Sequence, residues 1–395
     1  METYRCAADL IRLHQPERPV LAFRPHAAKR AARWFLHNFP GHCLYAVKAN
    51  DAPHMLDVLV ASGIHEFDVA SMAEIERIAS IPGARAHVMH PIKSRELIRR
   101  AYFDYGIRTF ALDCEAELQK ILTETGNASD LNLMVRMSCP NGFSEIPLEG
   151  KFGISWVDAA DLLRQTRQAA DCLGLTFHVG SQAMSPAAYG LALRTTSQHI
   201  VHAGVVADII DVGGGFPSAY PGMEPPALGD YMDEIREVFD QIAVGWHCEL
   251  WAEPGRALVA EAESVIVRVE ARKGDTLYIN DGSFGVLYDA AHVNFTYPAR
   301  RVEVSGKSGG AGPVAPFALY GPTCDSVDHM PGPFYLPQSI AEGDFIEIGN
   351  IGAYGRVMSS RFNGFGHYEN VTLLDEPLVS MYGDSEPLKE TAASH

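Results

Sequence analysis

Charged and imidazole side chains follow short apolar runs at several points along the chain, where they could build a reactive site. The first is Lys48, which comes directly after the apolar run in LYAVKAN. Burial lowers the pKa of a lysine toward the neutral amine that forms a Schiff base, so Lys48 is a candidate nucleophile. The other such residues are Asp68, His90, Asp113, Arg136, His178 and Glu253. One polar residue at a strand end is usually a cap, but this number of them favours a shared site.

Two glycine-containing motifs predict that the same site binds an anion. DVGGGFP contains Gly213–Gly215, and EPGR places Glu253 close to Arg256. Consecutive glycines let backbone N–H groups approach a phosphate, and an arginine can pair with the same phosphate. Three glycines alone are more often only a turn. Together with Lys48, the two motifs predict a pocket for a phosphorylated, protonatable heterocycle.

The elements that must position these residues alternate between strand and helix. The apolar, β-rich runs are Leu44–Val47, Phe67–Val69, Ala86–Met89, Thr109–Leu112, Leu131–Met137, Leu175–Val179, Ile209–Val212 and Glu249–Ala252. The helix-period segments between them are Ala52–Ser62, Met72–Ile81, Ser94–Asp104, Cys114–Gly126, Trp156–Leu173, Pro186–Ala203 and Asp230–Val244. Such alternation requires parallel strands, and eight units over about 250 residues match a (β/α)₈ TIM barrel. We therefore predict a barrel over residues 20–260, with its site at the carboxyl ends of the strands and a long loop at 216–230.

After about residue 260 the sequence pattern changes from alternating strands and helices to strands. Alternating strands are predicted at Ser264–Arg272, Thr276–Asn280, Phe345–Ile348 and Glu369–Leu374, with little helical periodicity. Residues 261–382, together with residues 1–19, are predicted to form a C-terminal all-β domain of the sandwich or barrel type. The Gly/Ser/Pro-rich stretch 305–316 predicts a hairpin loop, and the polar residues 383–395 predict a disordered tail.

Composition limits the possible partners. The 395 residues carry a net charge of −17, which disfavours nucleic acid and anionic lipid and weakly favours a cationic small molecule. Seven cysteines lack CxxC or Cys/His metal spacing, so we expect a reducing compartment and no metal. The first 19 residues lack an apolar signal region, and no run is long enough to span a membrane. We therefore expect a cytoplasmic protein.

The motifs, taken in order, resemble those of the pyridoxal 5′-phosphate (PLP) decarboxylases that combine a barrel with a β domain, the ornithine decarboxylases in particular. They are YAVKAN, FDVAS with the downstream Glu74, HVGS, DVGGGFP, EPGR, NDGSFG followed by LYDAAH, GPTCDSVD, and GAYG followed by FNGF. The resemblance covers nearly the whole chain. The short loop before GPTCDSVD is similar to that of compact bacterial members.

The resemblance implies a role for each residue around the cofactor. Lys48 would bind PLP covalently, His178 would stack on the pyridine ring, and Glu253 would pair with the ring nitrogen. The positions that resemble phosphate ligands are Ser181, Gly214, Gly215, Gly255, Arg256 and Tyr354. Asp68, Glu74 and Arg136 match positions that support Lys48, His178 and the phenolic oxygen of the cofactor.

The resemblance also implies a homodimer with shared active sites. Cys324 and Asp325 would reach into the site of the partner subunit, where Cys324 would protonate the substrate Cα after CO₂ leaves. Asp325 and Asp289 would receive the distal ammonium of the substrate, because paired carboxylates favour a cation. Tyr288 and Phe362 would line the same end of the pocket.

The implied reaction is decarboxylation of L-ornithine to putrescine, and several alternatives stay open. Lysine differs by one methylene, worth only ~1–3 kcal/mol in a pocket, so an enzyme that acts on both substrates is the strongest competitor. Asp325 disfavours a diaminopimelate decarboxylase, which carries Glu there, and an alanine racemase would give Cys324 no role. A non-catalytic protein of the antizyme-inhibitor kind is disfavoured because Lys48, His178 and Glu253 are all present.

Overall fold

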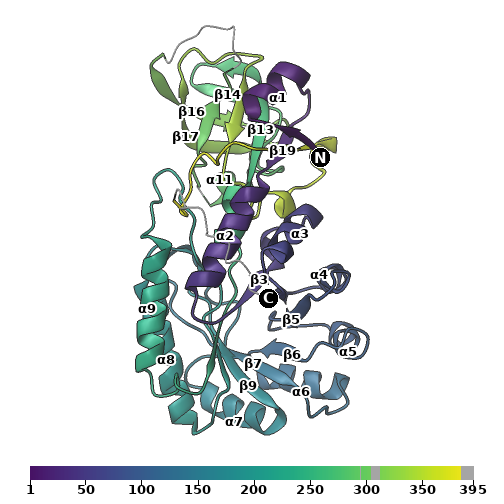
Figure 1. Ribbon diagram of the computed structural model, residues 1–395, viewed down its shortest axis with the longest axis vertical. Coiled ribbons are helices and arrows are strands. Elements are labelled where there is room, and N and C mark those ends of the chain that lie inside the picture. The colour runs from purple at the N-terminus through teal and green to yellow at the C-terminus, as the bar shows by residue number, and fades with distance from the viewer. Residues whose placement is uncertain (294, 304–311, 384–395) are drawn as a thin grey trace, which may run out of the picture.

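The computed structural model describes residues 1–293, 295–303 and 312–383 of the chain. It has two parts that lie end to end along the long axis, with a closed barrel surrounded by helices at one end and a β-sheet domain at the other (Figure 1). The predicted fold class, a TIM barrel followed by a β domain, is confirmed. Among the described residues, no helix is long and apolar enough to cross a membrane.

Eight parallel strands close the barrel, and all eight were predicted. They are β3 (His42–Ala46), β4 (Glu66–Val69), β5 (Arg85–Val88), β6 (Thr109–Leu112), β7 (Asn132–Arg136), β9 (Cys172–Thr176), β11 (Ile209–Asp211) and β12 (Glu249–Ala252). Side chains of these strands point inward, and Leu44, Ala111, Met134 and Trp251 pack together as an inner core. The barrel interior is therefore filled by side chains, which leaves its two ends for polar groups.

Helices cover the outside of the barrel. They are α2 (Pro25–Asn38), α3 (Pro53–Ala61), α4 (Met72–Ala79), α5 (Arg95–Phe103), α6 (Glu115–Glu124), α7 (Ala159–Ala169), α8 (Ala187–Ala203) and α9 (Leu228–Gln241). The helix predicted over Trp156–Leu173 is too long at both ends. Residues 172–173 instead begin β9, which pairs with β7 from Cys172 onward, so pairing between strands overrides the local helical pattern.

A nine-stranded sheet forms the second part. Its main path runs β1 (Glu2–Tyr4), β19 (Glu369–Leu373), β2 (Val20–Phe23), β13 (Glu263–Lys273), β14 (Thr276–Ile279), β16 (Val314–Tyr320) and β17 (His329–Pro337), while β15 (Ala299–Arg301) and β18 (Phe345–Ile348) pair beside β13. Helix α1 (Ala7–His14) packs on this sheet. Residues 20–23 were predicted to belong to the barrel, and that prediction is wrong. All four are buried, and they pair with β13 on one side and β19 on the other.

Two further predictions concern connecting segments. The hairpin loop predicted at 305–316 lies partly outside the described residues, and where the structure describes it the prediction fails, because residues 314–316 begin β16. Strands β16 and β17 were not predicted, since Pro316, Pro331, Pro333 and Pro337 interrupt the apolar pattern. The three prolines of β17 are tolerated because this strand lies at the end of the main path, and Pro316 lies outside the part of β16 that pairs with β14. The predicted disordered tail lies outside the described residues from 384 onward.

Asp281, a buried carboxyl in the β domain, leads to a prediction about pH and stability. Tyr368 Oη donates to Asp281 Oδ1 at 2.9 Å and the Val286 N–H donates to Oδ2 at 3.2 Å, yet burial raises the pKa of Asp281 to about 7. The pKa of Asp281 in the folded protein lies above its ordinary value of 3.8. Its contribution to the free energy of unfolding is therefore largest below pH 3.8. It is lost as the pH rises through about 7. Wild-type apoprotein should therefore lose more unfolding free energy than Asp281→Asn between pH 5 and pH 8.

Urea unfolding of both proteins at the two pH values checks this. Asp9→Asn, at an acidic residue on the exposed side of α1, is the matched control and should retain the pH slope of the wild type. An Asp281→Asn slope equal to that of the wild type would contradict the assignment.

Candidate active site

A cavity of about 600 Å³ opens at the carboxyl ends of the barrel strands, facing the β domain. The structure brings together in its lining most of the residues predicted from the sequence. These are Lys48, Asp68, Arg136, His178, Ser181, Glu253, Arg256, Tyr288, Asp289 and Tyr354. They come from five barrel-strand ends or the loops after them and from two segments of the β domain. The structure thus places these ten residues together at one end of the barrel.

Lys48 lies in the short 3₁₀ turn Val47–Ala49 that follows β3, and its amine faces β4. Lys48 Nζ is 3.1 Å from Asp68 Oδ2, and 46% of the lysine side chain is exposed to the cavity while the aspartate is buried. Burial lowers the pKa of Lys48, but the negative charges of Asp68 and Glu253 outweigh it, so the net shift is upward. The expected low pKa is therefore wrong, because the carboxylates favour the ammonium form.

Glu253 follows β12 and is 3% exposed, and its Oε1 has no hydrogen-bond partner. Burial raises the pKa of Glu253 well above its ordinary value, and the neighbouring carboxyls of Asp211 and Asp68 raise it further. Leaving such an atom unpaired in a low-dielectric site is costly, so the site calls for a donor, preferably a cationic one. A protonated ring nitrogen would satisfy Oε1. The residues present thus fit a pyridinium cofactor.

His178 follows β9 and is held in its neutral form. Its Nδ1 accepts a hydrogen bond from the backbone N–H of Gly180 at 3.1 Å, which requires an unprotonated Nδ1. Burial lowers the pKa of His178 well below its ordinary value, and the positive charges of Arg136 and Lys48 lower it further. A neutral imidazole therefore lines the cavity and can pack against a ring without adding positive charge.

The glycine loop after β11 provides close access for an anion. A Cβ at Gly214 would lie 2.8 Å from the carbonyl oxygen of Glu253 and 3.0 Å from His178 Nε2, and Gly215 has φ +101°. Only glycine fits at these two positions. Arg256, the last residue of the EPGR motif, is buried, and its Nε has no partner. Its guanidinium lies 4.9 Å from the centre of the Tyr354 ring. These groups can hold a phosphate.

Arg256 also joins the barrel to helix α11 (Tyr288–His292) of the β domain. Arg256 Nη2 donates to Asp289 Oδ2 at 3.2 Å, and Nη1 donates to Tyr220 Oη at 3.0 Å. Both members of the ion pair are buried, at 3% and 8% side-chain exposure. Asp289 therefore orients the arginine, a contact that the sequence did not predict.

The pair leads to a prediction for Asp289→Asn. Neutralising the carboxylate removes one charge-assisted hydrogen bond from Arg256, so the dissociation constant for PLP should rise about tenfold. Titration of the apoprotein with PLP, followed by absorbance, measures this. Asp161→Asn, at an exposed residue of α7 outside the cavity lining, is the control and should bind PLP normally. Unchanged PLP affinity in Asp289→Asn would contradict the orienting role.

Three of the residues predicted for the substrate end of the site lie outside the cavity of their own chain. Cys324 and Asp325, between β16 and β17, are exposed, and Phe362 is 41% exposed. Cys324 Sγ donates to Asn363 Oδ1 at 3.1 Å, and Phe362 packs at 4.8 Å between ring centres on Phe284. The GPTCD and FNGF motifs thus form one exposed patch on the β domain.

Two predicted acidic residues act on the backbone near the cavity. Glu74 accepts a hydrogen bond from the N–H of Ala70 at 2.6 Å, while the Ser71 hydroxyl accepts from the N–H of Glu74. This arrangement resembles a capping box, with the Glu74 bond made to the residue before the N-cap Ser71, and it starts α4 just after β4. Asp113 accepts from the N–H of Gly153 at 2.9 Å and so fixes the segment after β7. Neither residue belongs to the cavity lining.

Sequence reasoning did not identify several residues of the cavity wall. Residues 146–149 and 151–152 line the cavity beside His90, which packs edge-to-face on Phe152 at 5.1 Å. This segment includes β8 (Ser144–Ile146), which pairs with β10 (Ser181–Ala183). The long interval between the strand at 131–137 and the next helix was the available signal.

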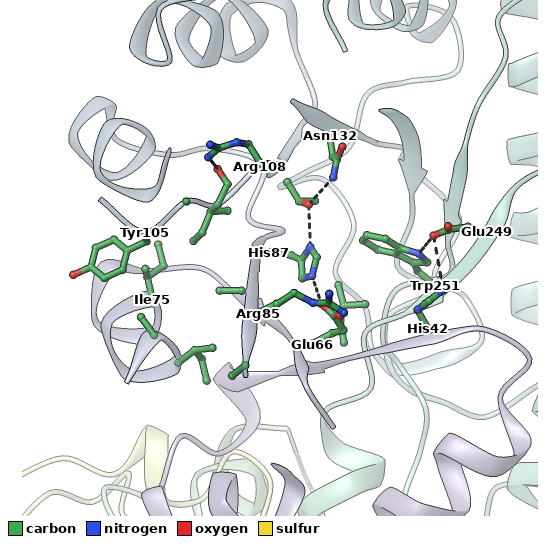
Figure 2. A pocket seen from close by; sticks show the side chains of 18 residues that line it. His42, Glu66, Ile75, Arg85, His87, Tyr105, Arg108, Asn132, Glu249 and Trp251 are labelled. Atoms are coloured by element: carbon green, nitrogen blue, oxygen red, sulfur yellow. Dashed lines mark hydrogen bonds and ion pairs between the residues drawn. The ribbon is translucent and has the colours of Figure 1, made fainter. Parts of the chain in front are cut away.

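A second hollow, of about 480 Å³, lies at the opposite end of the barrel strands (Figure 2). Its polar groups satisfy one another. His87 bonds to Glu66 at 2.6 Å and to Thr109 at 2.9 Å, and Trp251 donates to Glu249 at 3.0 Å. In the part of the chain that the structure describes, none of the buried, unpartnered side-chain nitrogen or oxygen atoms lies here. This end of the barrel therefore serves stability.

The closed barrel, the β domain and a cavity that fits a phosphorylated pyridinium define a PLP-dependent enzyme. The model for the pyridoxal binding domain of pyridoxal-dependent decarboxylases matches residues 26–260, more than half of the chain. The chain belongs to the pyridoxal-dependent decarboxylase family. The predictions of PLP as cofactor and of a carboxy-lyase are confirmed.

Named relatives agree on the chemistry but differ in substrate. The chain is 30% identical over 360 residues to a lysine/ornithine decarboxylase of Selenomonas ruminantium, covering 88% of each chain. It is also 30% identical over 354 residues to a diaminopimelate decarboxylase of Pseudomonas fluorescens, covering 85% of this chain and 82% of the relative. The structure of a Vibrio vulnificus lysine/ornithine decarboxylase complexed with putrescine matches with a TM-score of 0.79 and 27% identity, covering 94% of this chain and 99% of that one.

Proposed function

We propose that this decarboxylase acts on L-ornithine and releases putrescine. The observation that carries the proposal is the carboxylate of Asp289, buried in the cavity wall beside the arginine on the phosphate side. Only one of its oxygens pairs with Arg256, so Oδ1 can accept from the distal ammonium of a diamino acid. The net charge of −17 favours the approach of such a cation. A relative and a solved structure that are named for lysine and ornithine support this substrate class.

The cavity residues that match the family motifs have chemical tasks in this reaction. When bound, PLP supplies the electron sink that amino acid decarboxylation needs. Lys48 would hold the cofactor, with Asp68 orienting its amine at 3.1 Å. Glu253 Oε1 would accept a hydrogen bond from the ring nitrogen and keep that nitrogen protonated. Neutral His178 would pack on the ring, while Ser181, Gly214, Gly215, Gly255, Arg256 and Tyr354 would hold the phosphate.

The substrate end of the site is completed by a second subunit in this proposal. Cys324 and Asp325 lie on an exposed patch rather than in the cavity, which is the placement expected of residues offered to a partner. Asp325 of one subunit would join Asp289 of the other around the distal ammonium. The Cys324 thiol would deliver the proton to the substrate Cα, and Tyr288 and Phe362 would line the pocket. A homodimer is thus the active unit.

Lysine is the second candidate substrate, because two similar proteins are named for both amino acids. Ornithine and lysine differ by one methylene, so discrimination between them depends on the length of the pocket and is worth ~1–3 kcal/mol. The seven free cysteines support a reducing compartment for either activity, and we place the enzyme in the cytoplasm.

Parallel assays of CO₂ release test the proposal. Purified protein supplied with PLP is given L-ornithine, L-lysine, L-arginine or meso-diaminopimelate, with Lys48→Ala as the inactive control. Faster release from ornithine than from the other three is the expected result. Equal release from ornithine and lysine would make this a dual enzyme, and release from diaminopimelate or arginine alone would overturn the proposal.

A further inference from the structure

The segment of residues 375–382, which follows β19, leaves the β domain and lies against the barrel. Ion pairs hold the first two residues of the segment, Asp375 and Glu376. Buried Arg24, between β2 and α2, donates from Nη2 to Asp375 Oδ1 at 2.7 Å and to Glu347 Oε1 at 2.7 Å. Arg30 on α2 pairs with Glu376 at 2.8 Å. The segment is therefore anchored where the sheet meets the barrel.

The other end of the segment is buried against the barrel. Tyr382 is 6% exposed and packs with Ala31 and Leu228. Its ring meets that of Trp34 edge-to-face at 5.6 Å. The Tyr382 hydroxyl donates to the carbonyl of Ala257 at 2.5 Å. This carbonyl belongs to the residue directly after Arg256, so Tyr382 supports the turn that carries the cavity arginine.

The chain from 256 to 262 needs such support because it consists of two very short helical turns, α10 (Arg256–Val259) and Ala260–Ala262. A short helix leaves carbonyls without partners inside the helix. The Ala260 carbonyl accepts from the N–H of Gly352 at 3.0 Å, in addition to the Ala257 carbonyl bonded by Tyr382. The Glu261 carboxylate accepts from Ser380 Oγ at 2.6 Å and from the N–H of Met381 at 2.6 Å. Two of these four bonds to 256–262 involve side chains of the 375–382 segment.

The same segment supports the chain that leads to Tyr354. A Cβ at Gly349 would lie 3.2 Å from Leu378 Cγ, so Leu378 packs closely on the start of that chain. Beyond the Gly352 contact, the Tyr354 N–H donates to the Ala49 carbonyl at 2.8 Å, next to Lys48. The 375–382 segment thus contacts both stretches of chain that place Arg256 and Tyr354 at the cavity.

We propose that Tyr382 and Ser380 are positioning residues for cofactor binding. They hold Arg256 and Tyr354 in the positions from which these two residues bind the phosphate of PLP. Neither residue lines the cavity, so both act through the turn at 256–262. The proposal rests on the assignment of Arg256 to the phosphate. It predicts that substitutions of Tyr382 and Ser380, outside the cavity, lower the affinity for PLP by weakening the contacts to its phosphate.

The test measures PLP affinity of the full chain. Tyr382→Phe keeps the ring in its packing site and removes only the hydroxyl, and a Ser380→Ala/Tyr382→Phe double variant removes both side-chain donors. The dissociation constant for PLP should rise about 3-fold in the first and about 10-fold in the second, as expected for the loss of one and of two side-chain hydrogen bonds. Tyr335→Phe, at a tyrosine that is 62% exposed on β17, is the matched control and should bind PLP like the wild type.

A second readout separates positioning from general stability. The ³¹P resonance of bound PLP should shift or broaden in both variants and stay unchanged in Tyr335→Phe. Variants that unfold at lower temperature but keep the wild-type PLP affinity and ³¹P signal would overturn the proposal. Arg256→Met is measured beside them. If it leaves PLP affinity unchanged, the phosphate assignment fails, whereas a loss there without a loss in the Tyr382 variants refutes only the positioning role.

Discussion

Replacing Glu253 by Gln is expected to leave PLP bound but to lower kcat by about 30- to 1000-fold, or ~2–4 kcal/mol of transition-state stabilisation. Glutamine has the same shape but cannot keep the ring nitrogen protonated, so the cofactor accepts electrons less readily. The effect should fall on kcat more than on KM, because the lost charge interaction matters most when CO₂ departs. Steady-state kinetics with L-ornithine and the absorbance of the bound cofactor measure the two parts.

Glu249→Gln is the matched control for this prediction. Glu249 lies on the same strand, β12, but at the opposite end of the barrel, and its side chain is 59% exposed. Its substitution should change kcat by less than about twofold, as for other surface replacements. Near-wild-type turnover in Glu253→Gln, with PLP bound, would remove Glu253 from the chemistry.

A mixture of Lys48→Ala and Cys324→Ala subunits is expected to recover activity that neither variant has alone. In a mixed dimer with shared sites, one site carries both substitutions and the other carries none. Random exchange of equal amounts gives half mixed dimers, so the mixture should reach about a quarter of the wild-type activity. The assay is CO₂ release from L-ornithine after subunit exchange, which differently tagged chains verify.

The control for this experiment is a mixture of two variants whose substituted residues belong to the same cavity of one chain. Lys48 and Glu253 line the same cavity of one chain, so in a mixed dimer of Lys48→Ala and Glu253→Gln subunits each cavity carries one of the two changes. Mixed dimers then contain no intact site, so the mixture should show only the average activity of its two components. Absence of recovery with Cys324→Ala, after exchange has been verified, would show that Cys324 does not serve a neighbouring subunit.

The barrel could be predicted because its signal is local. Each strand is a short apolar run with a helix behind it, and the reactive residues stand where the runs end. The sheet that a strand joins is not a local property. Val20–Phe23 is as apolar as a barrel strand, yet Phe23 pairs with Glu263, far along the chain. Strands β16 and β17 escaped prediction because their prolines are tolerated only by their place in the sheet.

Most residues of the candidate site could be predicted from the sequence, but the directions of their pKa shifts could be predicted less well. Lys48 and Glu253 followed from motif and spacing, but the sign of the Lys48 pKa shift depends on the distance to Asp68, which sequence does not give. Asp211, whose carboxyl helps to raise the pKa of Glu253, was visible at the end of a strand but was passed over. The Arg256–Asp289 pair joins two domains and needed the structure.

The most direct test of the proposed reaction is to run it in D₂O and examine the product by NMR and mass spectrometry. Holoenzyme given L-ornithine should release CO₂ and putrescine in equal amounts, with one deuterium at the carbon that lost the carboxylate. Lys48→Ala should give neither. Exchange of the α-hydrogen of ornithine without CO₂ release, or no product above the Lys48→Ala control, would contradict the assignment of this cavity as an ornithine decarboxylase site.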